Sequence, residues 1–178
     1  KRTKGRLLSL STWRDEKSVV RWRTHGEHHV VQGKGRFQVF EDYHLRVGQV
    51  TSDTAPPNEA SMEPIRSDET EIGTAKFCTI TEVLPTEKAI AAATLYQADA
   101  NASGLLDHES FESITSPGKL LVLASWRDGS SAADWCAKRI ISVSGIRHRQ
   151  VRVIRDYGMF DRREAPQFYP DVAAAERK

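Results

Sequence analysis

The hydrophobic pattern of this chain contains the same segment twice. Residues 7–13 read LLSLSTW and residues 120–126 read LLVLASW, and Arg-Asp follows directly in both places. One offset of 113 positions aligns Trp13 with Trp126 and also Trp22 with Trp135, so the four tryptophans of the chain form two pairs with the same internal spacing. Agreement of this kind at a single offset indicates two copies of one supersecondary unit.

The first copy predicts a strand, a two-piece helix and a second strand. Residues 5–13 are apolar and rich in serine and threonine, which is typical of a strand with one buried face. Asp15 is a good N-cap for a helix that Gly26 interrupts, because glycine weakens a helix interior. From Tyr43 to Val50, large apolar residues alternate roughly with polar ones, which predicts a half-exposed strand.

The second copy predicts a complete strand–helix–strand–strand–helix–strand unit. Its predicted elements cover residues 75–84, 89–98, 105–114, 119–126, 130–141 and 148–156. Asp128 is the predicted N-cap of the helix over residues 130–141. This order is the split β-α-β, ferredoxin-like arrangement. Two such sheets can bury their uncovered apolar faces against each other. We therefore expect an α+β fold of tandem ferredoxin-like modules, whose antiparallel sheets pack as an intrachain α+β barrel.

The predicted domain boundaries follow from the repeat. Residues 1–53 are expected to form the C-terminal half of a first module, and residues 75–160 a complete second module. Residues 54–74 contain three prolines and few large apolar side chains, which predicts a linker. Residues 161–178 are expected to form a C-terminal tail.

Composition narrows the functional classes. With 39% hydrophobic and 28% charged residues, the chain has the makeup of an ordinary globular protein. A net charge of +2 is too small to indicate a nucleic-acid or membrane surface, and no apolar run approaches the ~20 residues of a membrane span. The two cysteines, Cys78 and Cys136, form no disulfide or metal motif and are interpreted as reduced thiols. We therefore expect a cytoplasmic protein without nucleic-acid or membrane partners.

The motifs of both copies resemble the antibiotic biosynthesis monooxygenase (ABM) superfamily of dimeric α+β barrel proteins. The likeness lies in a strand that ends in Trp, a charged residue and an acid, in a second Trp nine residues later, in a His-x-x-His-like segment and in a closing Tyr-x-Leu-Arg-Val strand. The first copy has Trp13-Arg14-Asp15, Trp22, His25-Gly26-Glu27-His28 and Tyr43-His44-Leu45-Arg46-Val47, and the second keeps Trp126-Arg127-Asp128, Trp135 and Val151-Arg152-Val153. The resemblance covers residues 5–53 and 76–157.

Two departures from the superfamily pattern qualify this resemblance. A whole module has two strands and a helix before the strand at residue 7. We therefore expect either an N-terminal segment before Lys1, which we favour, or completion of the first module by another chain. Haem-degrading members carry an axial His ten residues after the Trp, but Gln32 and Gly145 stand at these positions, and residues 77–81 offer no Asn. The resemblance thus implies a monooxygenase without the haem-oxygenase constellation.

Four histidines are the candidate catalytic residues. His25 and His28 lie three apart on one helical face, close enough to share a metal, a haem or a proton path. No cysteine or acidic motif at ligand spacing accompanies them, so we expect no metal site. His108 and His148 lie on or beside predicted strands of the second copy and are candidate general bases. The alternative for each is a structural or solvent-facing role, which is the commoner one.

Aromatic residues are the candidate substrate contacts. Paired tryptophans can line a hydrophobic pocket inside the predicted barrel, although a tryptophan at a strand–helix junction is more often part of the core. The full set of candidates is Trp13, Trp22, Phe77, Tyr96, Trp126 and Trp135.

By its resemblance, the chain is expected to be a monooxygenase that acts on a flat, apolar or aromatic small molecule without flavin. No flavin, nicotinamide or phosphate-loop fingerprint is present, so we expect no cofactor, with haem as the alternative. The residues leave two other functions open: a haem- or small-ligand-binding protein that uses His25 or His28, and a barrel scaffold without a ligand. Because only the first copy has helical histidines, function is expected to be asymmetric. A homodimer is a further expectation.

Overall fold

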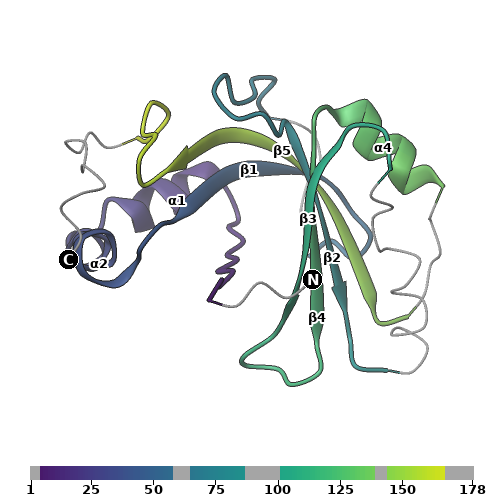
Figure 1. Ribbon diagram of the computed structural model, residues 1–178, viewed down its shortest axis with the longest axis horizontal. Coiled ribbons are helices and arrows are strands. Elements are labelled where there is room, and N and C mark those ends of the chain that lie inside the picture. Colours follow the sequence, from purple (N-terminus) through teal and green to yellow (C-terminus); the bar gives the residue numbers. More distant parts are fainter. Residues whose placement is uncertain (1–4, 58–64, 87–100, 139–143, 167–178) are drawn as a thin grey trace.

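The described strands form one antiparallel sheet (Figure 1). The computed structural model describes residues 5–57, 65–86, 101–138 and 144–166. Its strands are β1 (His44–Asp53), β2 (Phe77–Val83), β3 (Leu105–Glu112), β4 (Leu120–Trp126) and β5 (Ile146–Gly158). They lie in the order β1-β5-β2-β4-β3, and every neighbouring pair is antiparallel. The predicted α+β class is therefore confirmed.

Strands β2 to β5 have the spatial order of a ferredoxin-like unit. The sheet runs β5-β2-β4-β3, so the first and third strands of the unit are central and the second and fourth lie outside them. All four strands predicted for the second copy are confirmed. The sequence predicted them because each carries an apolar run or the period-two alternation of a pleated strand. The helix predicted over residues 89–98 lies outside the described residues.

Strand β1 extends this sheet beyond β5. It belongs to the first copy, so the closing strand of the first copy pairs with the closing strand of the second. The ladder shifts register between Val47 and Gly48. A Cβ on Gly48 would lie 2.4 Å from a methyl carbon of Val151, so glycine is required for this close approach of the two strands. The second sheet that the predicted barrel requires is not formed by the part of the chain that the structure describes.

Each copy has a helix that begins with the same aspartate cap. The Oδ1 atom of Asp15 accepts a hydrogen bond from the backbone N–H of Ser18 at 2.7 Å. In the second copy, Oδ1 of Asp128 accepts from Ser131 N–H at the same distance. These caps open the helices α1 (Glu16–Arg23) and α4 (Gly129–Ala137). Both caps are confirmed, because a cap depends only on residues close in the sequence.

The interruption predicted at Gly26 is also confirmed. Helix α1 ends at Arg23, and the chain continues as α2 (Gly26–Lys34) and a π-helical turn, η1 (Gly35–Val39).

The prediction of a strand over residues 5–13 is wrong. After a turn at Gly5, this segment has no regular secondary structure. A strand needs a neighbouring backbone to pair with its N–H and C=O groups, and none of the described strands pairs with this segment. The matching strand β4 has β2 on one side and β3 on the other. The same pattern therefore forms a strand only where neighbours exist.

Helix α4 packs on one face of the sheet, which we call the inner face (Figure 1). Ala132, Trp135 and Cys136 of α4 are buried against Ala124 and Trp126 of β4. Around this core pack the partly buried Phe77, Ala102, Leu105 and Ile146. Because side chains alternate along a strand, the residues next to these point to the opposite, outer face of the sheet.

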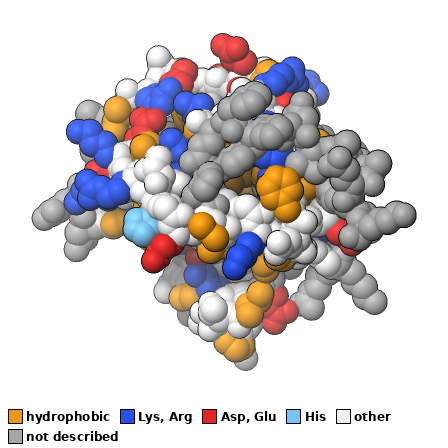
Figure 2. All heavy atoms as spheres, turned by 90° about the vertical axis from the view of Figure 1, so that its left-hand side faces the viewer, with side chains coloured by type: hydrophobic (Ala, Val, Ile, Leu, Met, Phe, Trp, Pro, Cys, Tyr) orange, Lys and Arg blue, Asp and Glu red, His pale blue; other side chains and the backbone are white. Residues whose placement is uncertain are grey.

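The helices of the first copy leave much apolar surface exposed. Trp13 is 38% and Trp22 45% exposed, whereas Trp126 and Trp135 are 0% and 4% exposed. Further exposed apolar side chains on α1, α2, η1 and the residue after η1 are Val20, Val30, Val31, Phe37, Val39 and Phe40. Figure 2 shows hydrophobic and charged side chains interspersed on this side of the molecule. The two copies thus have similar local structure, but the tryptophans of the first copy are exposed and those of the second copy are buried.

One carboxylate ties part of the predicted linker to β5. Glu164 accepts hydrogen bonds from the backbone N–H groups of Glu71 and Ile72 at 2.7 and 3.1 Å. It also accepts from the Thr70 hydroxyl and from Asp156 N–H of β5, both at 2.6 Å. Residues 70–72 are therefore held against the sheet by specific hydrogen bonds.

Replacing Asp128 by alanine should lower the free energy of unfolding by about 1 kcal/mol, because it removes the cap of a helix that packs on the core. The matched control is Asp15→Ala, which removes the same cap from α1. None of the residues of α1 is buried, so melting of α1 should affect global unfolding less. Urea denaturation followed by circular dichroism measures both variants. Equal losses would contradict this assignment of the core.

Candidate functional site

The two tryptophans of the second copy pack together on the inner face. Their ring centroids lie 5.4 Å apart with the planes tilted by 45°, which is a favourable arrangement for an aromatic pair. Trp126 is fully buried, and its indole N–H donates to Oγ1 of Thr79 on β2 at 3.0 Å. Phe77 lies directly opposite Trp126 in the ladder. These rings form a continuous apolar wall.

His148 is buried beside this wall. Its ring centroid lies 5.9 Å from that of Trp135. Nδ1 lies 2.8 Å from Oγ1 of Thr81, and Nε2 lies 3.0 Å from Sγ of Cys136. A neutral imidazole satisfies both contacts, since one ring nitrogen donates and the other accepts. Burial lowers the pKa of His148 to about 4, against the opposing charge of Asp53, so the ring is neutral at pH 7.

We call these residues the inner-face cluster: Phe77, Thr81, Trp126, Trp135, Cys136 and His148. Trp126 and Trp135 are 0% and 4% exposed and pack against each other and α4, so they belong to the hydrophobic core, which is the alternative that the sequence left open for them. The neutral imidazole can accept a proton, but its low pKa makes it a weak base at pH 7. Neither Cys78 nor Cys136 forms a disulfide, and both are buried.

The first copy repeats the tryptophan geometry in an exposed setting. The centroids of Trp13 and Trp22 lie 5.2 Å apart with a tilt of 41°, close to the values of the second pair. His28 stacks on Trp22 with 3.6 Å between ring centroids, and its Nε2 lies 2.8 Å from Nε2 of Gln32. Partial burial and the nearby His25 lower the pKa of His28. We call Trp13, Trp22 and His28 the first-copy group.

The structure therefore sorts the predicted site residues into two separate groups. The inner-face cluster lies beneath α4, and the first-copy group lies on the helices at the other side of the molecule (Figure 1). His25 is an exposed residue at the N-cap of α2 and makes no side-chain capping bond. His108 is exposed on the edge strand β3, paired with Ala124 on the inner face. Tyr96 lies outside the described residues.

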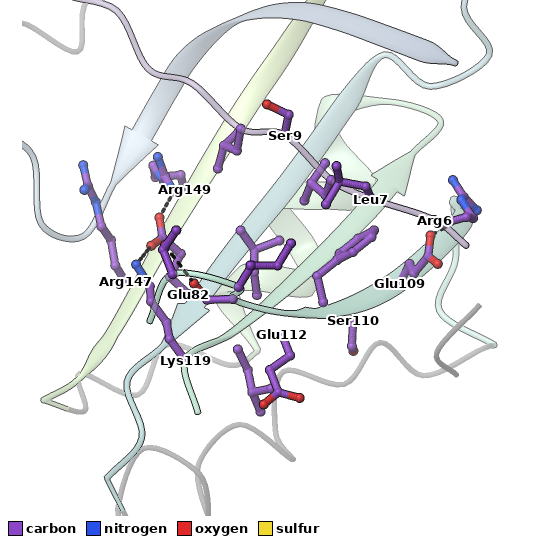
Figure 3. A pocket seen from close by; sticks show the side chains of 18 of the residues that line it. Arg6, Leu7, Ser9, Glu82, Glu109, Ser110, Glu112, Lys119, Arg147 and Arg149 are labelled. Atoms are coloured by element: carbon purple, nitrogen blue, oxygen red, sulfur yellow. Dashed lines mark hydrogen bonds and ion pairs between the residues drawn. The ribbon is translucent and has the colours of Figure 1, made fainter. Parts of the chain in front are cut away.

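Sequence reasoning missed a pocket of about 780 Å³ on the outer face. Figure 3 shows the N-terminal segment, residues 6–12, crossing the sheet, with the side chains of the pocket between the two. Leu7, Leu8 and Leu10 line it from the segment, and Phe111 and Leu121 line it from the sheet. The signal in the sequence was the spacing of charges on β2 and β5, but only the register shows that Arg147 lies opposite Glu82.

A group of charged side chains lies at one end of this pocket. Glu82 pairs with Lys119 and with Arg149 (Figure 3). Arg147 binds Asp53 through two hydrogen bonds of 2.6 and 3.0 Å. Burial alone would raise the pKa of Glu82, but the hydrogen bond from Lys119 and the charges of Arg149 and Lys119 outweigh it, so the pKa is lowered. Glu82 is therefore ionised at pH 7.

Two further features are absent from the described residues. No group of three or more His, Cys, Asp or Glu side chains among them is arranged to hold a metal ion. None of the helices in the described part of the chain is long and apolar enough to cross a membrane.

Comparison with known proteins identifies the family. The chain is 44% identical over 176 residues to the jasmonate monooxygenase ABM of the fungus Pyricularia oryzae, in an alignment that covers 95% of this chain and 78% of the relative. The chain belongs to the ABM family. Its similarity to the crystal structure of protein SO0527 from Shewanella oneidensis is lower, with a TM-score of 0.37 and 20% identity over 47% of this chain and 96% of the other. No family model matches the chain.

The buried state of His148 should make stability depend on pH. Its pKa is about 4 in the folded chain and 6.5 in an unfolded one, so the unfolded chain binds a proton in a range where the folded chain does not. The free energy of unfolding should therefore fall as the pH drops from about 6.5 towards about 4. Between about pH 7.5 and about pH 5, this group alone should account for a loss of about 2 kcal/mol.

Urea denaturation across that range tests the effect with His148→Gln, which removes the titrating group but keeps a polar side chain. This variant should lose about 2 kcal/mol less than the wild type over the same range. His108→Gln, at an exposed position, is the matched control and should follow the wild type. Parallel pH profiles for the wild type and His148→Gln would contradict the prediction.

Proposed function

We propose that this ABM-family chain is a monooxygenase that acts on a small, largely apolar molecule without a bound flavin or metal. The observation that carries the proposal is the 44% identity, over nearly the whole chain, to a protein named as a jasmonate monooxygenase. Jasmonate is therefore one substrate to test, and a flat phenol or quinol is the other. Haem binding without turnover and a ligand-free scaffold are the alternatives.

We place the substrate against the inner face of the sheet. Support comes from the rim of the core on this face, where Phe77, Leu105 and Ile146 are only partly buried and present apolar surface. His108 faces the same side of the sheet and is exposed, so it can meet a substrate before any rearrangement of the core. We assign His108 as the proton acceptor. His148, held by Thr81 and Cys136, acts as a positioning residue for the wall.

The proposed chemistry needs no flavin when the substrate itself supplies the electrons. A phenol or quinol with an activated CH₂ group reacts as CH₂ + O₂ → C=O + H₂O, so one oxygen atom enters the product and the other leaves as water. Removal of a proton by a base makes the substrate electron-rich enough to reduce O₂. The protein then contributes proton transfer, orientation and exclusion of water.

We further propose that residues 1–53, which include the first-copy group, are the C-terminal half of a first module of the same kind. The identical caps and the near-equal tryptophan geometries support this duplication. In the second copy, Trp126 lies beneath α4, and Thr79 of the neighbouring strand β2 accepts a hydrogen bond from its N–H. By analogy, Trp13 and Trp22 would be covered by an equivalent sheet, which is the tandem arrangement that the sequence predicts. The same proposal includes the packing of the first module's sheet against the sheet of the second copy as a barrel.

Turnover under ¹⁸O₂ tests the proposed function. The purified chain is incubated with jasmonate or with a quinol, with and without NADPH, and products are analysed by mass spectrometry. With the quinol, one ¹⁸O atom per product without NADPH is the expected result. Jasmonate has no phenol or quinol group to supply two electrons, so its oxygenation is expected only with a reductant such as NADPH. His108→Asn should lower kcat by about 100-fold or more, as expected for loss of a general base. A need for NADPH with the quinol would overturn the flavin-free part of the proposal.

The matched control is His25→Ala, since His25 is an exposed histidine of the first copy. It should leave turnover unchanged. Loss of activity in His25→Ala, with His108→Asn unaffected, would move the site to the first copy. A haemin titration that shifts the Soret band, without any turnover, would instead favour the ligand-binding alternative.

A further inference from the structure

We propose that the outer-face pocket binds an uncharged, largely aliphatic small molecule. The pocket lies between residues 6–12 and the sheet (Figure 3) and has a volume of about 780 Å³, which falls within the range of small-molecule sites, roughly 300–1,000 Å³. It lies on the opposite face of the sheet from the inner-face cluster, so this proposal does not rest on the oxygenase function.

Apolar side chains line both walls of the pocket and are incompletely covered. On the sheet, Phe111 and Leu121 are half-buried. On the N-terminal segment, Leu7 and Leu10 are 68% and 42% exposed. Strand β4 lies between two other strands, and its inner-face residue Ala124 is only 1% exposed, so its outer face lacks the cover that its inner face has. An aliphatic molecule between the two walls would remove this surface from water, which favours binding by roughly 25 cal/mol per Å² buried.

The charged side chains around the pocket favour an uncharged ligand, because each positive one is already bound to a carboxylate. Four positive and four negative side chains surround the pocket: Arg6 pairs with Glu109, Lys119 and Arg149 pair with Glu82, Arg147 pairs with Asp53, and Glu112 is the fourth acid. An ionised ligand would have to take its partner from one of these pairs. Breaking a largely buried pair leaves a charge without compensation, so the pocket is expected to exclude both anions and cations.

The N-terminal segment makes a second copy of the chain a poor occupant of this face. Two sheets that pack face to face lie about 10 Å apart and fill the space between them with interdigitating side chains. Residues 6–12 already cross this layer above β3 and β4 (Figure 3). A small molecule fits between the segment and the sheet, whereas another sheet would have to displace the segment.

The backbone of residues 6–12 is expected to become more ordered when a ligand binds beneath it. These residues make no backbone hydrogen bond to the described part of the chain, and one end of the segment is held by the ion pair of Arg6 with Glu109 at 3.0 Å. A backbone without hydrogen bonds exchanges its amide protons rapidly. Closure of the segment over a ligand should therefore slow this exchange.

Calorimetric titration of the whole chain with three probes of equal chain length tests the proposal. 1-Octanol should bind, and octanoate and octylammonium should each bind at least about tenfold more weakly, because each brings a charge that has no partner in the pocket. Equal or tighter binding of either ion would overturn the uncharged character of the ligand. Failure of 1-octanol to bind would overturn the proposal as a whole, and a dimer that Leu121→Ser dissociates in sedimentation would then assign this face to a second copy.

Hydrogen exchange and one variant locate the binding. In the wild type, 1-octanol should slow amide exchange of residues 7–12 about fivefold or more. Leu7→Ser, at an exposed position, should weaken 1-octanol about fivefold, as expected for loss of an apolar contact. Binding of 1-octanol that leaves the exchange of residues 7–12 unchanged would overturn this location.

The matched control is Val31→Ser, which changes a similarly exposed apolar side chain on α2 that does not line the pocket. It should bind 1-octanol like the wild type. Equal weakening by Val31→Ser and Leu7→Ser would show non-specific adsorption on apolar surface and overturn the site.

A second variant separates this proposal from the proposed function. His108 faces the inner side of the sheet, so His108→Asn should lose turnover but bind 1-octanol like the wild type. Loss of 1-octanol binding in this variant would contradict the separation of the two faces. Because binding is measured without turnover, either proposal can fail while the other stands.

Discussion

The pairing of β2 with β4 and β5 is the constraint on which the rest of this structure depends. β2 is hydrogen-bonded along its whole length on both sides, so its register decides which side chains share a face of the sheet. Thr79 and Thr81 point to the inner face, where they hold Trp126 and His148. Glu82 points to the outer face, where Arg149 and Lys119 meet it. A shift of one residue would exchange the two faces.

The two faces of the sheet differ in polarity because different segments of the chain cover them. Helix α4 excludes water from the inner face, and burial there keeps His148 neutral. The outer face is crossed by an irregular segment that leaves room for a pocket, and its charged side chains stay ionised by pairing with one another. One sheet therefore has an apolar environment on one face and paired charges on the other.

The two copies of the repeat show how far local sequence decides structure. The aspartate caps and the tryptophan pairs are nearly the same in both copies, since their contacts lie within about ten residues. The segment before each cap differs. Leu120–Trp126 is a strand between two neighbours, whereas residues 7–13 pair with none of the described strands and are irregular. Strand formation depends on distant segments, and helix capping does not.

The sequence alone predicted the α+β class, the four strands of the second copy and both helix caps, because hydrophobic periodicity and capping residues are local properties. Its motifs resemble the ABM family, which the comparison with a relative shows. It also named Trp126, Trp135, Phe77 and His148 as site candidates. It could not determine that these four meet beneath α4 while Trp13, Trp22 and His28 lie elsewhere.

Only the tertiary structure decided the contacts of His148 with Thr81 and Cys136, the pairing of β1 with β5, and the pocket around Arg149. Each of these joins residues far apart in the sequence. Their meeting depends on strand register and on burial, and a pattern read along one strand contains neither.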